Sequence, residues 1–570
     1  QFGTILSETG AGFTWFGNSQ RNRLTGWSND PVLDPHSEVI YIRDEDSGQV
    51  WNPTAGPIRE RNAYRVSHGA GYSRYEHNSH AIEQLLTIFV PTDGQGGEPV
   101  KISKLALRND SRKTRVLSIT YYLEWTLGEQ REVTQQHVVT EYDSKRSTIL
   151  ARNGYHPDYG ERVAFASISP GAESFTCDRT TFLGRNRGAK NPAALNRVEL
   201  AGRVGAGLDP CGALQTRVEI PPGESVDVIC IMGQGESKDQ VKSLVRKFRE
   251  VLAVNQALDE TRSFWDRILD AVQVETPEQS VNFLLNRWLL YQSLSCRIWG
   301  RSAVYQSGGA IGYRDQLQDV AAFLFTDPSL AREQILLAAS RQYSEGDVQH
   351  WWHPPSGVGI RSRISDDLLW LPYITAQYLQ VTGDRDILQE QIPFLIAPEL
   401  EPDQGEILIE PQVSMDKASL FEHCRRAVEK GLTQGPTGLP LIGTGDWNDG
   451  LNRVGEEGRG ESVWLGWFLV HVLKDMEWLS EVFGEKELVS HYRRESKALE
   501  SRIESSAWDG AWYIRGRFDD GSPLGSAANF EARIDSLPQS WPWISDAGDP
   551  ERKEQALESA WRQLVRQEEK

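Results

Sequence analysis

The chain has 570 residues, a formal net charge of −19 at pH 7 and a hydrophobic content of 39%. This length allows roughly two to four domains, and the acidic balance argues against a nucleic-acid or anionic-membrane surface, because phosphate groups select basic faces. No apolar run approaches the ~18–20 residues that a membrane span needs, and the start carries no signal-peptide pattern. Five scattered cysteines form no Cys-x-x-Cys pair, which predicts reduced core thiols and favours a cytoplasmic protein.

Strand-like runs dominate the chain before residue 237. Short segments rich in β-branched or aromatic residues are bounded by Gly, Asn, Asp or Pro; the clearest are 100–107, 115–124, 162–169 and 225–232. Regular short strands separated by turn signals are typical of an antiparallel sandwich. We therefore predict a β-sandwich domain over residues 1–236.

Helical periodicity replaces the strand pattern from residue 237 onward. Apolar residues recur at a spacing of about 3.6, which predicts a helical linker over 237–275. The rest, 276–570, consists of further helices joined by polar, Gly-rich or Trp-rich loops. The predicted helices are 281–295, 317–325, 330–341, 366–382, 420–430, 462–483, 488–505 and 554–567. Many antiparallel helices without βαβ alternation favour a helical bundle or an (α/α) toroid, so the expected fold class is α+β multidomain.

The most distinctive motif is the Gly-rich turn 443–452, in which Asp446 and Asp449 flank Trp447 and Asn448. An indole offers a sugar ring an apolar face. The amide and one carboxylate can hold hydroxyl groups, and the other carboxylate can carry a proton. We therefore interpret the turn as a sugar site, although an Asp-Gly turn with N-capping aspartates would produce the same pattern.

A second polar cluster begins at a loop-to-helix junction, residues 312–319. The neighbouring Arg314 and Asp315 can fix two adjacent sugar hydroxyls, with the arginine orienting the carboxylate. An acidic helix N-terminus would explain the same residues without a ligand. The second cluster shifts the balance toward a sugar site, because two separate motifs now point to it.

Further candidates lie between these two motifs. Arg361 and Arg363 precede a predicted helix start at Ser365 and could bind an anion. His350 and His353 suggest a metal, but no third ligand stands at a suitable spacing, so we predict no metal site. The sequence carries no Gly-x-Ser-x-Gly elbow and no cysteine in a nucleophile setting, which leaves paired carboxylates as the catalytic option.

Four ordered motifs resemble glycoside hydrolase family 94, the inverting β-glycoside phosphorylases. They are GYRDQLQD at 312–319, SDDLLWLP at 365–372, GLPL at 438–441 and GDWNDGLN at 445–452. Two further segments, 17–31 and 305–309, are similar to the branch that contains the β-1,2-oligoglucan phosphorylases and the C-terminal part of cyclic β-1,2-glucan synthase. The resemblance implies a β-sandwich, a helical linker and an (α/α)6 barrel, in agreement with the pattern of predicted elements.

The resemblance also implies residue roles. Asp449 is the general acid, and Trp447 and Asp315 line the subsite of the departing glucosyl unit with Arg314 beside them. Asp446 and Asn448 remain as groups that hold hydroxyls. Asp449 would protonate the glycosidic oxygen while inorganic phosphate, the co-substrate, attacks the anomeric carbon from the opposite face and releases α-glucose 1-phosphate; no cofactor is implied. Because the acid must be protonated near neutral pH, we expect it in a partly desolvated site.

One departure from the family pattern concerns phosphate. The family's C-terminal phosphate-holding motif and its further helices are missing from this sequence, so the expected barrel is incomplete at the C-terminus. Arg361 and Arg363 are then the local phosphate candidates. A C-terminal segment or a second chain would complete the barrel, and by family analogy the protein is expected to form a homodimer.

Two other functions remain open. A noncatalytic glucan-binding or chain-length-sensing module of a cyclic β-1,2-glucan synthase would bind oligosaccharide without turnover. An inverting β-glucosidase would need a second carboxylate about 6.5–9.5 Å from the acid to activate water, and Asp366, Glu456 and Glu457 are the sequence candidates. A phosphorylase can omit that base because phosphate is already anionic.

Overall fold

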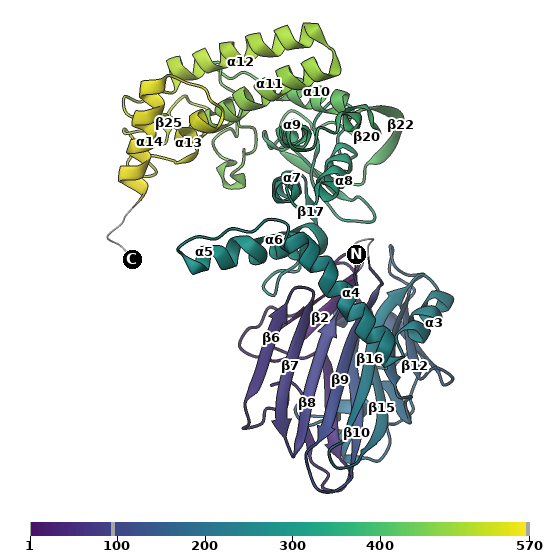
Figure 1. Ribbon diagram of the computed structural model, residues 1–570. Helices are drawn as coiled ribbons and strands as arrows, with labels where there is room; N and C mark the ends of the chain where they lie inside the picture. The colour runs from purple at the N-terminus through teal and green to yellow at the C-terminus, as the bar shows by residue number, and fades with distance from the viewer. Residues whose placement is uncertain (1, 93–96, 566–570) are drawn as a thin grey trace. The chain divides into compact units, whose positions relative to one another are not determined.

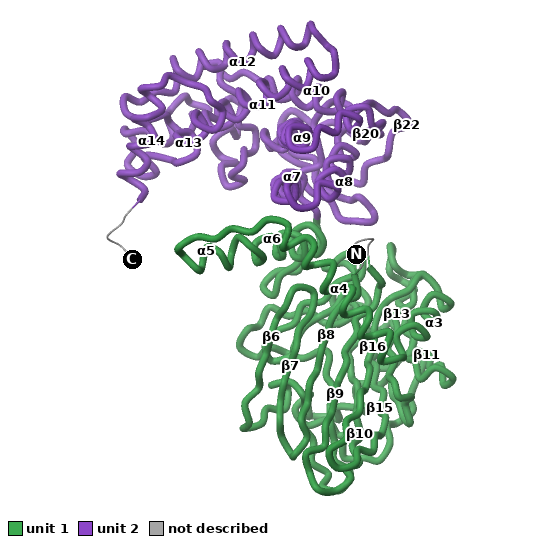
Figure 2. The backbone as a smooth tube through the Cα atoms, viewed as in Figure 1, with its two compact units in different colours: residues 1–310 green, residues 311–570 purple. Residues whose placement is uncertain are grey.

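The computed structural model describes residues 2–92 and 97–565. It divides into two compact units, Gln1–Ala310 and Ile311–Lys570 (Figure 2). The division falls after the boundary expected at 275/276, because α5 (Gln279–Phe283), α6 (Leu289–Gln292) and the π-helical turns beside them group with the first unit. The domain boundaries drawn from sequence stay predictions.

Two eight-stranded antiparallel sheets form the body of the first unit (Figure 1). One contains β1 (Phe2–Leu6), β2 (Gly12–Phe16), β3 (Arg23–Thr25), β10 (Arg115–Gly128), β15 (Pro210–Ile220) and β14 (Ser174–Asp178) in that order, with β4 (Glu38–Asp44) paired to β10 and β5 (Val50–Trp51) paired to β4. The other contains β11 (Val138–Asp143), β12 (Thr148–Asn153), β13 (Val163–Ser169), β16 (Ser225–Gly235), β9 (Val100–Asn109), β8 (Ile82–Phe89), β7 (Tyr72–Ser79) and β6 (Tyr64–Gly69).

Alternating side chains of the two sheets meet in one apolar core. On β10, Leu117, Ile119, Tyr121 and Leu123 are buried there, and Leu105 of β9 belongs to the same cluster. Successive strand residues point to opposite faces, so one strand supplies the core at every second position. The predicted β-sandwich is confirmed, and all four predicted strands are present as β9, β10, β13 and β16.

Two helices follow the sandwich along the predicted linker. α3 (Lys238–Lys247) begins at Ser237, whose Oγ accepts the Gln240 N–H at 3.3 Å. Its buried residues Val241, Leu244 and Val245 pack against β13 and β16. α4 (Val251–Leu269) buries its own apolar stripe partly in the same cluster. Most of the predicted helical linker, 237–275, is therefore helical.

The second unit is built mainly from helices. They are α7 (Tyr313–Val320), α8 (Pro328–Ala339), α9 (Trp370–Thr382), α10 (Leu420–Gly431), α11 (Val463–Phe483), α12 (Lys486–Ser506), α13 (Leu537–Ile544) and α14 (Pro550–Leu564). α11 is apolar on nearly every side, because α9, α10, α12 and α13 all pack against it. Ser462 caps its start by accepting the Leu465 N–H at 3.1 Å, and Gly484 ends it with a φ of +101°.

Short strands interrupt this helical unit where the sequence predicted only loops. One sheet contains β17 (Ile311–Gly312), β18 (Gln349–Trp352), β19 (Gly359–Ser362) and β21 (Glu406–Ile409), and a hairpin joins β20 (Gln391–Ile396) to β22 (Gln412–Ser419). A third sheet contains β23 (Glu461–Ser462), β24 (Gly516–Arg517) and β25 (Pro523–Leu524). Several of these partners lie far apart in the chain, so local periodicity could not reveal them.

Closure into an (α/α)6 barrel stays a prediction. α14 ends at Leu564, and residues 566–567 of the predicted last helix lie outside the described residues. Within 2–92 and 97–565, we find no helix with the length and apolar content required to cross a bilayer.

Candidate active site

The predicted sugar turn is attached to the extended segment before α9. Ile364 and Gly443 form a β-bridge, and the Ser365 N–H and hydroxyl both donate to the Gly445 carbonyl at 3.0 Å. Gly443 has a φ of +62°, and a Cβ there would lie 2.0 Å from the Arg363 carbonyl oxygen. The turn therefore needs glycine at this close approach, and its position is set by the chain that starts α9.

Asp446 fixes the turn through hydrogen bonds to its buried side chain. Its side chain is fully buried. Oδ1 accepts hydrogen bonds from Arg515 Nη2 at 2.6 Å and from the Asn448 N–H at 3.1 Å, and Oδ2 accepts one from Ser462 Oγ at 2.7 Å. A carboxylate saturated in this way positions the loop. Its burial disfavours the direct sugar contact expected from the sequence.

Arg314 gathers the acidic residues of the site. It lies on the first turn of α7 and is buried. Nη1 donates to Asp366 Oδ1 at 2.8 Å and to the Asp446 carbonyl at 2.7 Å, and Nη2 donates to Asp449 Oδ1. The guanidinium thus joins α7 to both ends of the 446–449 turn, and its charge is opposed by carboxylates. Arg314 thus contacts Asp449 directly, and sugar binding by Arg314 stays a prediction.

Trp447, Asn448 and Asp449 form the exposed side of the turn. The Trp447 ring is half-exposed, and its Nε1–H donates to Gln318 Oε1 at 3.3 Å. Asn448 caps the short 3-10 turn Asp449–Leu451, its Oδ1 accepting the Gly450 N–H at 3.0 Å. An indole fixed at one edge with an open face suits stacking on a sugar ring.

The environment of Asp449 differs from the expected desolvated pocket. Its side chain is 60% exposed, and its only ion pair among the described residues is with Arg314. The exposure arises because the turn projects from the helices while its anchor, Asp446, lies beneath it. If Asp449 is to be partly desolvated, another group, such as a bound substrate, must shield its carboxyl group from water.

Asp315 lies one residue beyond Arg314 and is partly exposed. Its carboxylate covers the helix start, since a Cβ added at Gly312 would lie 2.4 Å from Asp315 Oδ2. Arg314 and Asp315 are adjacent in the sequence, but their side chains have different surroundings in the structure: Arg314 contacts Asp366 and Asp449, and Asp315 lies over Gly312. Sugar binding by Asp315 stays a prediction.

His350 belongs to the same cluster, although its sequence pattern suggested only a metal ligand. On β18, its Nδ1 lies 2.8 Å from Asp367 Oδ2. Burial lowers the pKa of His350, but Asp367 and, to a smaller extent, Asp449 raise it, with a net increase. The signal that could have found it is its place in the His-Trp-Trp-His run beside the aspartate pair 366–367.

Asp366 is the most deeply buried carboxyl of the cluster. Its oxygens accept hydrogen bonds from Arg314 Nη1 and, at 3.0 Å, from Trp370 Nε1. Burial raises the pKa of Asp366 to about 7, although Arg314 opposes the increase. With both oxygens bonded and no exposed surface, Asp366 is not placed to activate a water molecule.

The phosphate role expected of Arg361 is not supported, because its donors are already bound. Arg361 is buried; it donates to both oxygens of Asp347 at 2.7 and 2.8 Å, to Glu345 at 3.1 Å, and to the carbonyls of Ala397 and Pro398. It holds the 345–347 and 397–398 segments together. These contacts disfavour an anion site at Arg361, and phosphate binding by this residue stays a prediction.

Arg363 is exposed but also serves the fold. Its Nε donates to the Gln404 carbonyl at 2.9 Å and its Nη2 to the Glu401 carbonyl at 2.8 Å. These contacts hold the 400–404 loop to the strand end. Phosphate binding by Arg363 stays a prediction with no further contact to support it.

The far end of the acid-bearing loop is held by Asp519. Its carboxylate accepts the N–H groups of Glu457, Arg459 and Gly460 at 2.8–2.9 Å. Desolvation opposes ionisation, but these donors lower the pKa of Asp519. Glu457 also pairs with Arg459, so this loop contributes surface ion pairs rather than a base directed at Asp449.

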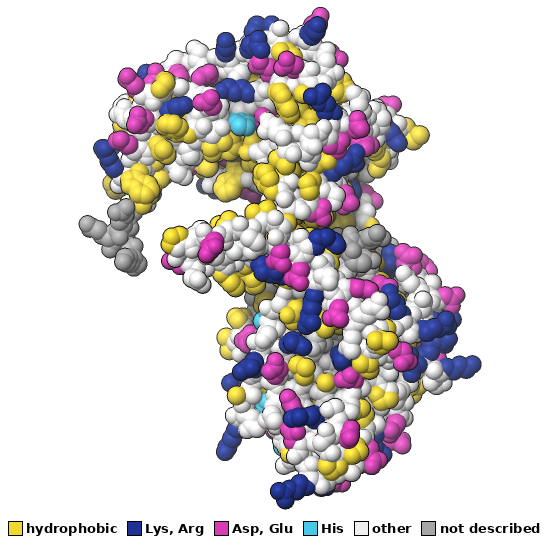
Figure 3. All heavy atoms as spheres, viewed as in Figure 1, with side chains coloured by type: hydrophobic (Ala, Val, Ile, Leu, Met, Phe, Trp, Pro, Cys, Tyr) yellow, Lys and Arg dark blue, Asp and Glu magenta, His cyan; other side chains and the backbone are white. Residues whose placement is uncertain are grey.

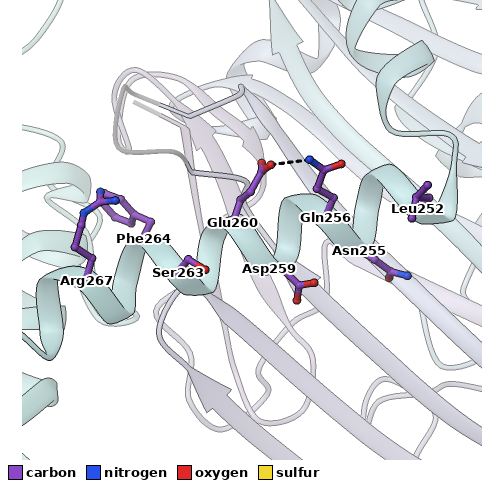
Figure 4. Close-up of a pocket in the computed structure, with 8 residues that line it drawn as sticks. All are labelled: Leu252, Asn255, Gln256, Asp259, Glu260, Ser263, Phe264 and Arg267. Carbon is purple, nitrogen blue, oxygen red and sulfur yellow. Dashed lines mark hydrogen bonds between the residues drawn. The ribbon is translucent and has the colours of Figure 1, made fainter.

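The described residues contain no group of three His, Cys, Asp or Glu side chains arranged to hold a metal ion. A shallow pocket runs along α4 in the first unit (Figure 4), lined by Leu252, Asn255, Gln256, Asp259, Glu260, Ser263, Phe264 and Arg267. None of the predicted site residues lines it. Its polar side chains follow one face of the helix, and Gln256 donates to Glu260 at 3.0 Å.

Comparison with protein families gives two matches that together cover most of the chain. A glycosyl hydrolase 94 supersandwich domain matches residues 1–251, and the catalytic domain of the glycosyl hydrolase 94 superfamily matches residues 264–569. The second match contains every residue of the cluster around Arg314. The first covers the two sheets and α3.

Relatives of known name fall into two groups. The chain is 42% identical over 570 residues to the cyclic beta-(1,2)-glucan synthase NdvB of Rhizobium meliloti (strain 1021), covering 99% of this chain and 20% of that protein. It is 26% identical to the N,N'-diacetylchitobiose phosphorylase of Vibrio proteolyticus, covering 98% of this chain and 71% of that protein. The chain thus spans only a fifth of the length of the synthase.

Among solved structures, a bacterial glucoamylase complexed with acarbose superposes with a TM-score of 0.54 at 11% sequence identity. The likeness covers 90% of this chain and 67% of that one. At this identity it shows the fold alone.

Proposed function

The chain belongs to glycoside hydrolase family 94, and from this premise we propose that it catalyses inverting phosphorolysis of β-glucosidic oligosaccharides, with inorganic phosphate as co-substrate. The observation that carries the proposal is the Arg314–Asp449 pair beside the open face of Trp447. One buried cation holds one exposed carboxyl next to a sugar-stacking surface. This is the minimum that acid-assisted cleavage of a glycoside requires.

In the proposed reaction, Asp449 gives its proton to the glycosidic oxygen as the bond to the anomeric carbon breaks. A phosphate oxygen forms the new bond from the opposite face, which inverts the configuration and yields α-glucose 1-phosphate and a shortened oligosaccharide. Arg314 then stabilises the carboxylate left on Asp449.

We propose β-1,2-linked glucan as the substrate class. The support is the 42% identity to a protein named as a cyclic beta-(1,2)-glucan synthase, over nearly all of this chain. Trp447, Asn448 and Asp315 are the proposed sugar-contacting residues; the first two are exposed and Asp315 is partly exposed. Asp446 supports them indirectly through Arg515 and Ser462.

A second candidate is a noncatalytic glucan-binding or chain-length-sensing module, since the chain matches only a fifth of the synthase. The hydrolase alternative is weaker, because Asp366 is buried with both oxygens bonded. We also keep the homodimer and the cytoplasmic location as predictions.

We further propose that more helices, from the same or a second chain, cover α14. Leu557, Trp561 and Leu564 form an exposed stripe on α14 beside the buried Ala556 and Ala560. Figure 3 shows apolar side chains at the surface near α14. Exposed apolar stripes of this kind mark interaction surfaces, which agrees with the incomplete barrel expected from sequence.

The deciding experiment measures α-glucose 1-phosphate released from β-1,2-oligoglucan and, separately, from cellodextrin, each with and without phosphate. We expect phosphate-dependent release from β-1,2-oligoglucan, abolished by Asp449→Asn. Glucose release without phosphate would indicate a hydrolase. Glucan binding without release, unaffected by Asp449→Asn, would indicate the noncatalytic module.

A further inference from the structure

A series of charged side chains connects His350 to the proposed acid, Asp449. The proposed reaction gives His350 no role. His350 Nδ1 lies 2.8 Å from Asp367 Oδ2, and Asp367 Oδ1 lies 3.9 Å from Arg314 Nε. Arg314 Nη2 in turn contacts Asp449 Oδ1. The residues come from β18, the start of η6 (Asp367–Leu369), α7 and the 446–449 turn, so four separate segments meet in one chain of contacts.

We propose that His350 is a positioning residue for the acid, acting on Asp449 through Asp367 and Arg314; this inference rests on the proposed function. His350 does not need to touch the substrate for this role. It acts by fixing the carboxylate against which the guanidinium of Arg314 is set.

The geometry of Asp367 supports this role. The residue is buried, and its Oδ1 has no hydrogen-bond partner among the described residues. His350 therefore supplies the hydrogen bond that holds this carboxylate in place. Leaving a buried carboxylate without it is costly. Asp367 would then turn toward Arg314 and compete with Asp449 for the guanidinium.

The charges of the cluster point the same way. Three carboxylates, Asp366, Asp367 and Asp449, lie around the single guanidinium of Arg314. The groups that act electrostatically on His350 are Asp367 and Asp449, which favour its cationic form, and Arg314, which opposes it. A protonated His350 supplies a second positive charge, and by reciprocity it stabilises the carboxylate that Asp449 becomes after proton transfer.

The first test is the pH dependence of kcat for His350→Gln with β-1,2-oligoglucan and phosphate. Loss of the positive charge that His350 supplies should move the basic limb of the pH profile upward by roughly 0.5–1 pH unit. We expect kcat to fall about tenfold with KM changed less than about twofold, because an interaction with the acid and not with the sugar is lost. A fall in kcat with no shift of the limb would indicate a merely structural role and overturn the proposal.

A matched control exists on α12. His491 Nε2 lies 3.4 Å from Glu429 Oε1, so it forms a histidine–carboxylate pair outside the cluster. His491→Gln should leave the position of the basic limb unchanged. A shift of equal size in this control would show that any histidine loss has the effect and would also overturn the proposal.

The second test does not depend on activity. Histidine-selective NMR labelling follows the imidazole titrations in the full chain, in Asp367→Asn and in Asp449→Asn. We expect one histidine to titrate at lower pH in both variants, with the larger shift in Asp367→Asn, and to be missing from the His350→Gln spectrum. If no histidine responds to Asp449→Asn, the proposed connection is wrong. If the connection is present but no phosphorolysis occurs, the proposed function fails and the cluster retains only its structural linkage.

Discussion

The two ends of the 446–449 turn each carry an aspartate paired with an arginine, and the pairs differ in their access to solvent. Asp446 is fully buried with Arg515, whereas Asp449 is 60% exposed and held by Arg314. Only two residues, Trp447 and Asn448, thus separate the buried anchor from the proposed acid. The same pair of residue types therefore fixes a loop where it is buried, and we propose that it presents a proton donor where the aspartate is exposed.

The largest effect that separates the two ends is expected from Asp449→Asn. The variant cannot donate a proton, so turnover should fall at least about 100-fold. Its stability should change by less than about 0.5 kcal/mol, since exposed substitutions seldom matter more. Steady-state phosphorolysis together with thermal unfolding checks both halves. Unchanged turnover would remove Asp449 from the reaction.

The converse is expected from Arg515→Met at the buried end. The change leaves Asp446 buried beside Ser462 without its cation, which typically costs about 3–5 kcal/mol. Denaturant unfolding of the second unit, followed by tryptophan fluorescence, measures the loss. The double variant Asp446→Asn with Arg515→Met serves as the control and should recover part of it. An unmoved transition in Arg515→Met would show that Asp446 does not depend on the pair.

Asp475 is a buried aspartate that is paired with a histidine and not with an arginine. Asp475 on α11 lies 3.5 Å from His471 Nε2, and burial lowers the pKa of that histidine. Burial raises the pKa of Asp475 to about 8. The folded chain therefore keeps the Asp475 proton up to about pH 8, whereas the unfolded chain releases it near pH 4. Because of this difference, the free energy of unfolding falls as the pH rises from about 4 to 8, by at most about 1.4 kcal/mol per pH unit.

Melting temperatures between pH 5 and 9 test this contribution. The wild type should lose stability relative to Asp475→Asn as the pH rises, because the amide stays neutral throughout. Parallel curves for the two proteins would contradict the assignment.

The smallest effect is expected at the open face between the two ends. Trp447→Ala should raise KM for oligosaccharide about tenfold, and Trp447→Phe, which keeps a ring but loses the Gln318 contact, only a few-fold. Gln318→Leu is the matched control and should resemble Trp447→Phe. Equal KM values for the alanine and phenylalanine variants would argue against stacking.

Local sequence patterns were sufficient for the framework of both units. Alternation of apolar residues predicted strands such as β9 and β10, and helical spacing predicted α11 and α12. The same patterns could not predict the short sheets of the second unit, where β19 pairs with β21 across more than 40 residues. Pairings of this kind depend on how loops return, and no local signal records that.

The sequence predicted which residues lie together at the candidate site better than it predicted what each of them contacts. The motifs located Arg314 and Asp449 together, and the structure brings them into contact. Burial, which sequence does not report, separates Asp446 from Asp449 and commits Arg361 to Asp347 and Glu345. His350 entered the cluster only through a contact with Asp367, 17 residues away.

Asp519 stays ionised over the pH range in which other groups of the site titrate. The loop beyond the acid is tied to this carboxylate by three backbone N–H groups, which keep it ionised to lower pH than usual. The tether thus holds its charge across the range in which His350 and Asp366 change theirs. An acid–base titration of activity in this protein should consequently contain no contribution from Asp519 in that range.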